Sequence, residues 1–236
     1  MRSLRRAPVY ALVVILTLAL GLASVGVMYA LVQGVLYAPL PYAQPERLVR
    51  IQLSLADGST VAHAPALAET YRRHATLVDE VGIYRIGRAN VGGGQDATGA
   101  ENLPVSWISA SLLRVLGVAP AMGRAFTPDE ARRGGPEAVI LSDREWRTRY
   151  AAAPDVIGRT LVVNDVVREI VGVMPAGFAF VDPRIRMWLP AKSSSDTSAG
   201  DFFYTAVARL APAASAAQAE QELAAILPRM AEQYPA

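Results

Sequence analysis

The first residues that could do chemistry are two histidines, His63 and His74, because an imidazole nitrogen can bind zinc or act as a general base. They lie eleven positions apart, and the chain has no cysteine to complete a zinc site. Spacing nominates no carboxylate as a further ligand. We therefore expect both histidines on the surface or on a helix face, and we predict no metal site.

Two groups of acids could act as a general acid and base: Asp129 with Glu130, and Asp143 with Glu145. Each group falls in the first turn of a predicted helix, where the helix dipole stabilises negative charge. We therefore expect solvated acids with a structural role rather than a catalytic pair.

The glycines at positions 92–94 could be taken for a phosphate-binding loop. Such a loop needs a lysine and a hydroxyl residue where it opens a helix, whereas Gln95 and Asp96 follow here. No serine lies in a G-x-S-x-G context either. The sequence thus predicts a hairpin loop, no catalytic or cofactor-binding residue, no cofactor and no enzymatic activity.

Composition narrows the class of protein further. The net charge is only +2, and the basic residues beyond position 46 are interspersed with acids, so no basic stripe for nucleic acid exists. The absence of cysteine excludes disulfides and thiolate metal sites. With 52% hydrophobic residues, the chain has enough apolar material to form a core without such cross-links.

An uncharged run occupies residues 7–44, and residues 9–36 within it are long and apolar enough for a membrane helix. Arg2, Arg5 and Arg6 precede the run, which favours a cytoplasmic N-terminus and places the residues after about Pro39 outside. The alternative is a cleaved secretory signal, but its apolar region is usually about 7 to 15 residues long. We predict a single-pass helix in the bacterial inner membrane.

The predicted membrane helix has a face of small residues, Gly26, Ala30 and Gly34, which recur every fourth position. Such spacing lets two helices approach closely in lipid. Glycine and alanine are also common in membrane helices, so ordinary composition explains the pattern as well. Pairing through this face is a hypothesis.

Hydrophobic periodicity, caps and breakers place the elements of the first half of the remaining chain. We expect an α+β fold. The predicted elements are a strand at 48–53, a helix at 65–76, a β-hairpin of 77–91 with 97–107, a helix at 110–116 between Ser109 and Gly117, and a helix that begins at Thr127 and stops at 134–136.

The same signals continue to the end of the chain. The predicted elements are a buried strand at 138–141, a helix capped by Ser142 that reaches Tyr150, a hairpin of 159–163 with 168–174 around Asn164 and Asp165, a strand at 187–190, an exposed loop at 192–200, a strand at 202–210, and a helix at 215–234 with Leu223, Ile226, Leu227 and Met230 on one face and a kink at Pro228.

Several ordered blocks resemble one family. After the apolar run the chain reads V-L-Y-A-P-L-P-Y-A-Q-P-E-R-L-V, and later V-S-W-I-S-A-S-L-L-R-V-L-G-V-A-P-A-M-G-R-A-F-T-P-D-E, A-V-I-L-S-D-R-E-W, V-I-G-R-T-L-V-V-N and I-V-G-V-M-P-A-G-F. These sequence blocks resemble the MacB-like periplasmic core domains of ABC transporter permeases of the MacB, FtsX and LolC type, most of all the duplicated orphan permeases of soil bacteria. The resemblance covers practically the whole chain.

The resemblance implies an α+β periplasmic domain of two lobes after the transmembrane helix. Residues 1–45 would be the cytoplasmic N-terminus and that helix, and residues 46–236 the core domain. Within the core domain, 46–118 and 200–236 would form a porter-like lobe of strand-helix-strand units, and 119–199 an inserted sabre-like lobe.

The resemblance also implies a function: a non-catalytic, membrane-anchored portion of a permease that couples ATP-driven movement to substrate efflux or to envelope partners. No further membrane helix and no nucleotide motif follows, so we expect other chains to supply an ABC ATPase and further permease helices, with a homodimer as one option and no nucleic-acid partner. The alternative is a single-anchor binding or sensing module without an ATPase. An envelope hydrolase has almost no residue support.

Overall fold

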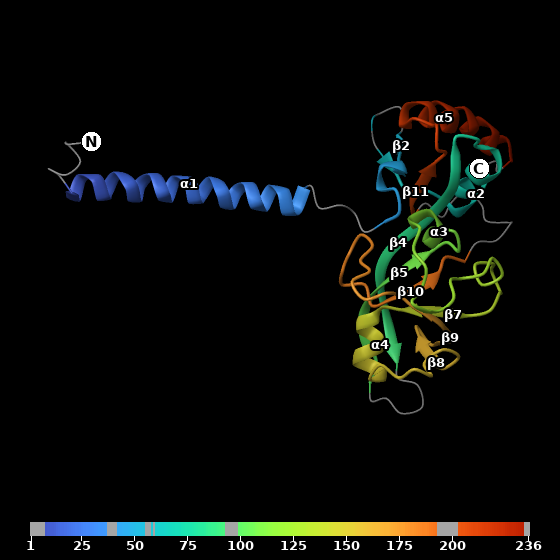
Figure 1. Cartoon of the computed structure of the whole chain (residues 1–236). Coiled ribbons are helices and arrows are strands. Elements are labelled where there is room, and N and C mark those ends of the chain that lie inside the picture. The colour runs from blue at the N-terminus through green and yellow to red at the C-terminus, as the bar shows by residue number, and fades with distance from the viewer. Residues whose placement is uncertain are drawn as a thin grey trace. The chain divides into compact units, whose positions relative to one another are not determined.

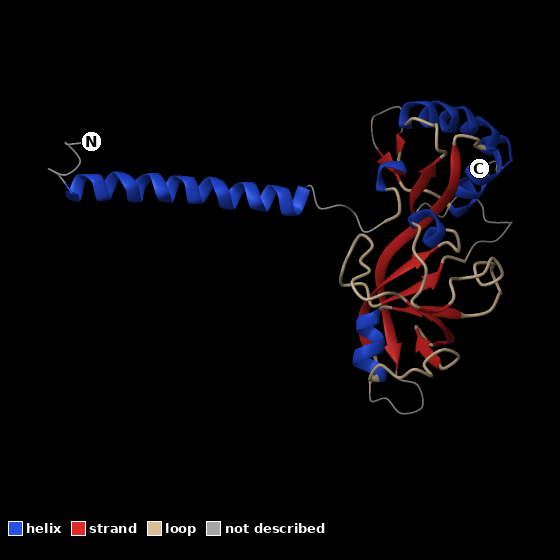
Figure 2. Cartoon of the chain, in the orientation of Figure 1, coloured by secondary structure: helices blue, strands red, loops and turns tan. Residues whose placement is uncertain are grey.

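The computed structural model describes residues 8–36, 42–54, 58, 60–92, 99–192 and 203–233. The chain divides into two compact units, Met1–Pro41 and Tyr42–Ala236. Figure 1 labels their helices and strands, and Figure 2 colours them by type. The apolar helix and the mixed α+β class that we predicted are both confirmed.

The described part of the first unit is one helix, α1 (Pro8–Leu36). Its window Leu12–Tyr29 has a mean hydropathy of 2.3, long and apolar enough to cross a membrane. At 1.5 Å per residue, α1 extends about 44 Å. The hydroxyls of Thr17 and Ser24 donate to carbonyl oxygens four residues earlier, at 2.8 Å, so these polar groups suit a hydrocarbon environment.

The second unit is organised around one long strand, β4 (Val78–Gly92). Its first half pairs antiparallel with β11 (Thr205–Leu210), which pairs in turn with β1 (Leu48–Ile51). Along its other edge β4 pairs antiparallel with β5 (Glu101–Ile108) over eight residue pairs. The first predicted hairpin is therefore confirmed, while its loop at 93–98 lies outside the described residues.

The second half of β4 closes a ring of strands, in the lower part of the unit in Figure 1. Going round the ring, β4 pairs with β8, β8 with β9, β9 with β7, β7 with β10, β10 with β5, and β5 with β4. The β7–β9 and β5–β10 pairs are parallel. The strands not yet given are β7 (Ala138–Leu141), β8 (Thr160–Val163), β9 (Val166–Val173) and β10 (Met187–Pro190).

This small barrel has a packed interior, as expected for a ring of so few strands. Its buried side chains are Ala89, Val91, Val105, Val139, Leu141, Val156, Leu161, Val163, Ile170, Val173, Met187 and Leu189. All four residues of β7 are buried, which explains why that strand reads as an unbroken apolar run. The barrel is thus a rigid core rather than a container for a ligand.

Two helices cover one face of the β1–β11–β4 sheet at the other end of the unit: α2 (Pro65–His74) and α5 (Ala216–Gln233). Leu223 and Ile226 of α5 are buried there, as predicted. A further core, around Trp188 and Phe180, packs α3 (Leu112–Leu116) against the sheet and the barrel. The remaining elements are η2 (Pro45–Arg47), β2 (Leu53–Ser54), β3 (Thr60–Val61), β6 (Met122–Gly123) and α4 (Asp143–Tyr150).

Local signals explain several of these elements. Asn164 and Asp165 have φ of 49° and 63°, the positive values that a two-residue hairpin turn favours, and they join β8 to β9. The Ser142 hydroxyl accepts from the Glu145 backbone N–H at 3.1 Å and caps α4. Gly117, at φ 68°, ends α3. These predictions are confirmed.

Other local predictions are wrong. Residues 127–134 form turns rather than a helix: Thr127 and Glu130 make the reciprocal hydrogen bonds of a capping box, but Gly134 and Gly135 follow before a helix can propagate. The residue before α3 is Ser111, because residues 109–111 lie in a turn in which the Ser109 hydroxyl accepts from the Ile83 backbone N–H. The predicted strand at 48–53 is interrupted at Gln52.

The lobe bounds at residues 118 and 200 stay a prediction. The second unit divides no further into compact parts, because the β4–β5 hairpin belongs both to the helix-covered sheet and to the barrel.

Gly123 offers a test of how closely β6 packs on β9. It has φ 74°, and a Cβ there would lie 2.2 Å from the carbonyl oxygen of Val171. We expect Gly123→Ala to lower the free energy of unfolding of the portion 42–236 by about 3 kcal/mol in urea denaturation. Gly158→Ala is the control, since Gly158 has φ 86° but nothing within 4 Å, and it should cost about 1 kcal/mol. Equal losses would show that crowding at Gly123 is unimportant.

Candidate functional site

The predicted packing face of α1 lies along one side of a continuous helix, because Gly26, Ala30 and Gly34 follow every fourth residue. A side chain built at Gly26 would meet nothing within 4 Å. Only the backbone of Ala30 and Gly34 is described. Pairing through this face stays a prediction.

The two histidines differ in their surroundings. His74 is exposed in the last turn of α2, as expected, but His63 is only 1% exposed and packs edge-on against Tyr71, so the expectation of a surface histidine is wrong for it. Burial, with a smaller effect of Arg50, lowers the pKa of His63 to about 4, and its Nε2 has no hydrogen-bond partner. Among the described residues, no three His, Asp or Glu side chains are grouped to hold a metal ion.

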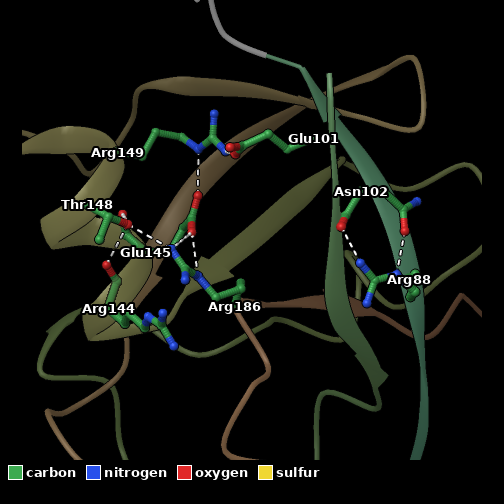
Figure 3. A network of polar contacts seen from close by, with 8 residues as sticks. All are labelled: Arg88, Glu101, Asn102, Arg144, Glu145, Thr148, Arg149 and Arg186. Carbon is green, nitrogen blue, oxygen red and sulfur yellow. Dashed lines mark hydrogen bonds and ion pairs between the residues drawn. The ribbon is translucent and has the colours of Figure 1, made fainter. Parts of the chain in front are cut away.

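The acids predicted to be solvated include two buried ones, which corrects that prediction. Glu145 is 1% exposed: its Oε1 accepts from Arg149 Nε at 2.5 Å and its Oε2 from Arg186 Nε at 2.7 Å. Figure 3 shows this network, in which Arg149 also reaches Glu101 and Arg186 also donates to Thr148. Burial alone would lower the pKa of Arg149, but its carboxylate partners outweigh burial and the pKa is raised.

Glu130 is the second buried acid, at 3% exposure. Both of its oxygens accept from Arg124, at 2.9 and 2.7 Å, and Oε2 also accepts from the Thr127 backbone N–H. Burial by itself would raise the pKa of Glu130, yet these hydrogen bonds lower it below its usual value. Asp129 and Asp143 instead form surface pairs with arginines.

None of these acids is arranged as a general acid or base. Glu130 and Glu145 form ion pairs with arginines, and their oxygens accept hydrogen bonds from those donors. A polar depression of about 150 Å³ lies elsewhere, around Arg50, Gln52, Thr60, His63 and Thr205, and no acid among the described residues lines it. The acids therefore act as clamps: Glu145 ties α4 to the segment before β10, across the barrel wall.

The first residues of the second unit are more informative. We call residues 42–47 the stem. Arg47 donates its Nε to the carbonyl oxygen of Leu210 at 2.8 Å, and its guanidinium also pairs with Asp79. Leu210 ends β11 and Asp79 lies at the start of β4, so one stem side chain contacts two neighbouring strands.

A side chain of the sheet also donates a hydrogen bond to the stem. Arg209 of β11 donates its Nε to the carbonyl oxygen of Val115 in α3 at 2.9 Å, and its Nη1 to the carbonyl oxygen of Gln44 at 3.4 Å. Ala43 packs so closely on Gly117 that a Cβ at that glycine would lie 2.7 Å from the Ala43 Cβ. The stem is therefore seated against both β11 and the end of α3.

Tyr42 is the first residue of the stem, and its side chain holds that end in place. Its hydroxyl donates to the carbonyl oxygen of Ala179 at 2.8 Å. Its ring contacts Phe180 edge-on, at 6.2 Å between centroids, and Phe180 in turn packs edge-on against Tyr84 of β4 at 4.9 Å. Burial raises the pKa of Tyr42, so the phenol stays protonated and keeps its donor.

The loop that meets Tyr42 holds an unusual backbone conformation. Val181 has φ 66°, and the Asp182 backbone N–H donates to the carbonyl oxygen of Phe180 at 2.8 Å across it. A β-branched residue in this region is strained, at a cost of about 1–3 kcal/mol. The contacts of Phe180 and Ala179 with the stem oppose that strain.

We call the stem together with these contacts the stem seat. It joins residues up to 165 positions apart, such as Arg209 and Gln44. Sequence reasoning missed it, since a lone tyrosine, a lone arginine and a loop carbonyl form no motif. The only signal was indirect: P-E-R after the apolar run and P-A-G-F both lie in the blocks that carry the family resemblance. Chemically, the side chains of the stem seat form hydrogen bonds and ring contacts that position the stem.

With this geometry described, comparison with solved structures defines the class of fold. The periplasmic region of MacB from Actinobacillus actinomycetemcomitans aligns with a TM-score of 0.59 at 14% identity, covering 78% of this chain and 84% of that one. A domain of a permease protein from Porphyromonas gingivalis gives 0.59 at 17% identity, over 81% and 84% of the two chains. The extracellular domain of the Gram-positive ABC-type transporter YknZ gives 0.56 at 15% identity, over 78% and 95%.

The fold is thus that of extracytoplasmic domains of ABC-type permeases. The chain belongs to the MacB-like periplasmic core domain family, whose profile matches residues 11–226. This confirms the family that the sequence blocks indicated.

Curated relatives agree with this assignment. The macrolide export ATP-binding/permease protein MacB of Sodalis glossinidius (strain morsitans) is 32% identical over 95 residues, which are 39% of this chain and 14% of that protein. The protein of the same name from Burkholderia thailandensis is 29% identical over 129 residues, or 53% and 20% of the two chains. The chain therefore spans a fifth or less of the length of these relatives.

The Glu145 network allows a direct test of its structural role. Glu145→Gln would remove the buried charge that pairs with Arg149 and Arg186, leaving Arg149 only its exposed partner Glu101, and we expect it to lower the free energy of unfolding by about 2–4 kcal/mol. Urea denaturation of the portion 42–236 measures this. Asp143→Asn on the same helix removes an exposed pair and should change stability little. A loss no larger than that of Asp143→Asn would contradict the role of Glu145 as a clamp.

His63 predicts a pH dependence of stability. Its pKa is 6.5 when unfolded and about 4 when folded, so between these values only the unfolded state takes up the proton. Stability from this group is therefore present above pH 6.5 and is lost as pH falls toward 4. We expect a loss of about 2 kcal/mol between pH 7 and pH 5 in urea denaturation.

His63→Leu should remove this part of the pH dependence, whereas His74→Ala should keep it, because His74 is exposed in both states. An identical slope for wild type and His63→Leu would assign the pH dependence to other groups.

Proposed function

We propose that this chain is the non-catalytic, membrane-anchored periplasmic portion of an ABC-type permease, and that it couples ATP-driven movement to substrate efflux or to envelope partners. The observation that supports this best is the stem seat, in which residues 42–47 are bonded to β4, to β11 and to the loop between β9 and β10. The arginines before α1 favour a cytoplasmic N-terminus and a periplasmic second unit.

The stem seat suits the transmission of force. In this proposal, a displacement of α1 enters the second unit at residues 42–47, where that unit begins. The stem cannot move alone without breaking three hydrogen bonds: Arg47 to Leu210, Arg209 to Gln44, and Tyr42 to Ala179. Since β4 continues from the seat into the barrel, movement of the stem would carry the whole second unit.

Other chains or segments would supply the energy. The curated relatives are named as ATP-binding/permease proteins for macrolide export, and that description is theirs. For this chain we propose an ABC ATPase partner, further permease helices and helix pairing through Gly26, Ala30 and Gly34. Homodimer formation through the same face is one arrangement that fits.

A second function is supported by the polar depression beside His63. Its lining by Arg50, Gln52, Thr60 and Thr205 would suit a small polar ligand, as in a single-anchor sensing module without an ATPase. At about 150 Å³ it falls below the volume usual for small-molecule sites, so we rank this function second.

Affinity isolation from membranes of the host tests the proposal. We expect an ATP-binding cassette protein to accompany the chain, and trapping of its nucleotide by vanadate to change hydrogen exchange in β1 and β11. Arg47→Ala should reduce that change at least severalfold, because it removes the bonds to Leu210 and Asp79.

Arg72→Ala is the matched control, as Arg72 is an exposed arginine on α2 with a partner on its own helix. Isolation without any ATPase, from membranes in which the chain is abundant, would favour the sensing module. A nucleotide response unaffected by Arg47→Ala would show that movement enters the second unit elsewhere.

A further inference from the structure

The loop at residues 175–184, which we call the strap, contacts Tyr42 of the stem and is fixed at both ends. Just before it, the Met174 backbone N–H donates to the carbonyl oxygen of Leu141 in β7 at 2.8 Å. Just after it, the Arg186 backbone N–H donates to the carbonyl oxygen of Pro104 in β5 at 2.9 Å. The barrel therefore holds the two ends, and only the middle of the strap is free to change position.

The middle of the strap combines a buried side chain with a strained one. Phe180 is 7% exposed between the rings of Tyr84 and Tyr42. Its neighbour Val181 is 56% exposed at φ 66°, so its side chain gains little from burial while its backbone is strained. The contacts with the stem must therefore hold this conformation in place.

We propose that the strap is a two-position latch on the stem. In the closed position, seen here, Phe180 lies between the two tyrosines and the carbonyl of Ala179 accepts from the Tyr42 hydroxyl. In the open position Val181 relaxes to an extended backbone, and Phe180 and Ala179 leave the stem. The strain brings the two positions closer in free energy, because it destabilises only the closed one.

The purpose of the latch rests on the proposed function, since opening would release the stem when α1 moves. The coupling itself is a property of this chain alone. If closure of the strap stabilises the stem, then seating of the stem must stabilise the strap by the same factor. This reciprocity can be measured without an ATPase.

Hydrogen exchange of the full chain in lipid nanodiscs, followed by mass spectrometry, tests the latch. Val181→Asn removes the β-branch and introduces a residue that tolerates positive φ. The closed position of the strap should therefore be favoured. We expect peptides from the strap to exchange about fivefold more slowly, and peptides from the stem to slow by a similar factor. Tyr42→Phe deletes the hydroxyl donor and should speed exchange in both segments by a similar factor.

Val167→Asn is the matched control, because Val167 is equally exposed, at 59%, on β9, and has no positive φ. It should leave hydrogen exchange in both the strap and the stem at the wild-type rate. Exchange in peptides from β7 should be unchanged in every variant. A slower strap beside an unchanged stem, or no change in either, would overturn the latch. An intact latch in a chain that binds no ATPase would instead contradict only the proposed function.

Discussion

The backbone ladder along β4 is the interaction on which the rest of the second unit depends. This single strand pairs with β11 in its first half, with β8 at its far end and with β5 along the opposite edge. Breaking it would separate the helix-covered sheet from the barrel. Because the ladder is continuous, the two parts cannot turn against each other without losing several hydrogen bonds at once. A displacement at the stem seat therefore reaches the barrel as a movement of the whole unit.

Arginine provides most of the remaining cross-links, and its geometry explains why. A guanidinium can donate in several directions, so Arg47 bonds a backbone carbonyl and a carboxylate at the same time, and Arg186 bonds both Glu145 and Thr148. Burial of the Glu145 carboxylate carries a desolvation cost, which two arginine partners offset. Such contacts add less net stability than an apolar core, but they fix the orientation of the groups that they join.

Elements set by short-range physics could be predicted from the sequence, and those set by distant contacts could not. The Ser142 cap, the Asn164-Asp165 turn and the apolar run of β7 each depend on a few adjacent residues. Closure of the barrel depends on pairs such as Val91 with Val163, and no local pattern specifies a partner so far along the chain. The burial of His63 and Glu145 was missed for the same reason: polar residues read as exposed until their tertiary neighbours are known. At Thr127 a valid capping box began a helix that two glycines ended.

The strained residue Val181 lies where a change of backbone conformation breaks few hydrogen bonds. In the sheet and barrel, a change of backbone conformation would break ladder hydrogen bonds on both sides of the affected strand. In the loop between β9 and β10, a change at Val181 breaks one short-range bond, from Asp182 to Phe180, together with the contacts to Tyr42. The ends of that loop stay tied to β7 and β5, so the change does not spread into the barrel. The second unit thus combines a rigid sheet and barrel with one adjustable contact at its first residues, an arrangement that a uniformly rigid or uniformly flexible domain would lack.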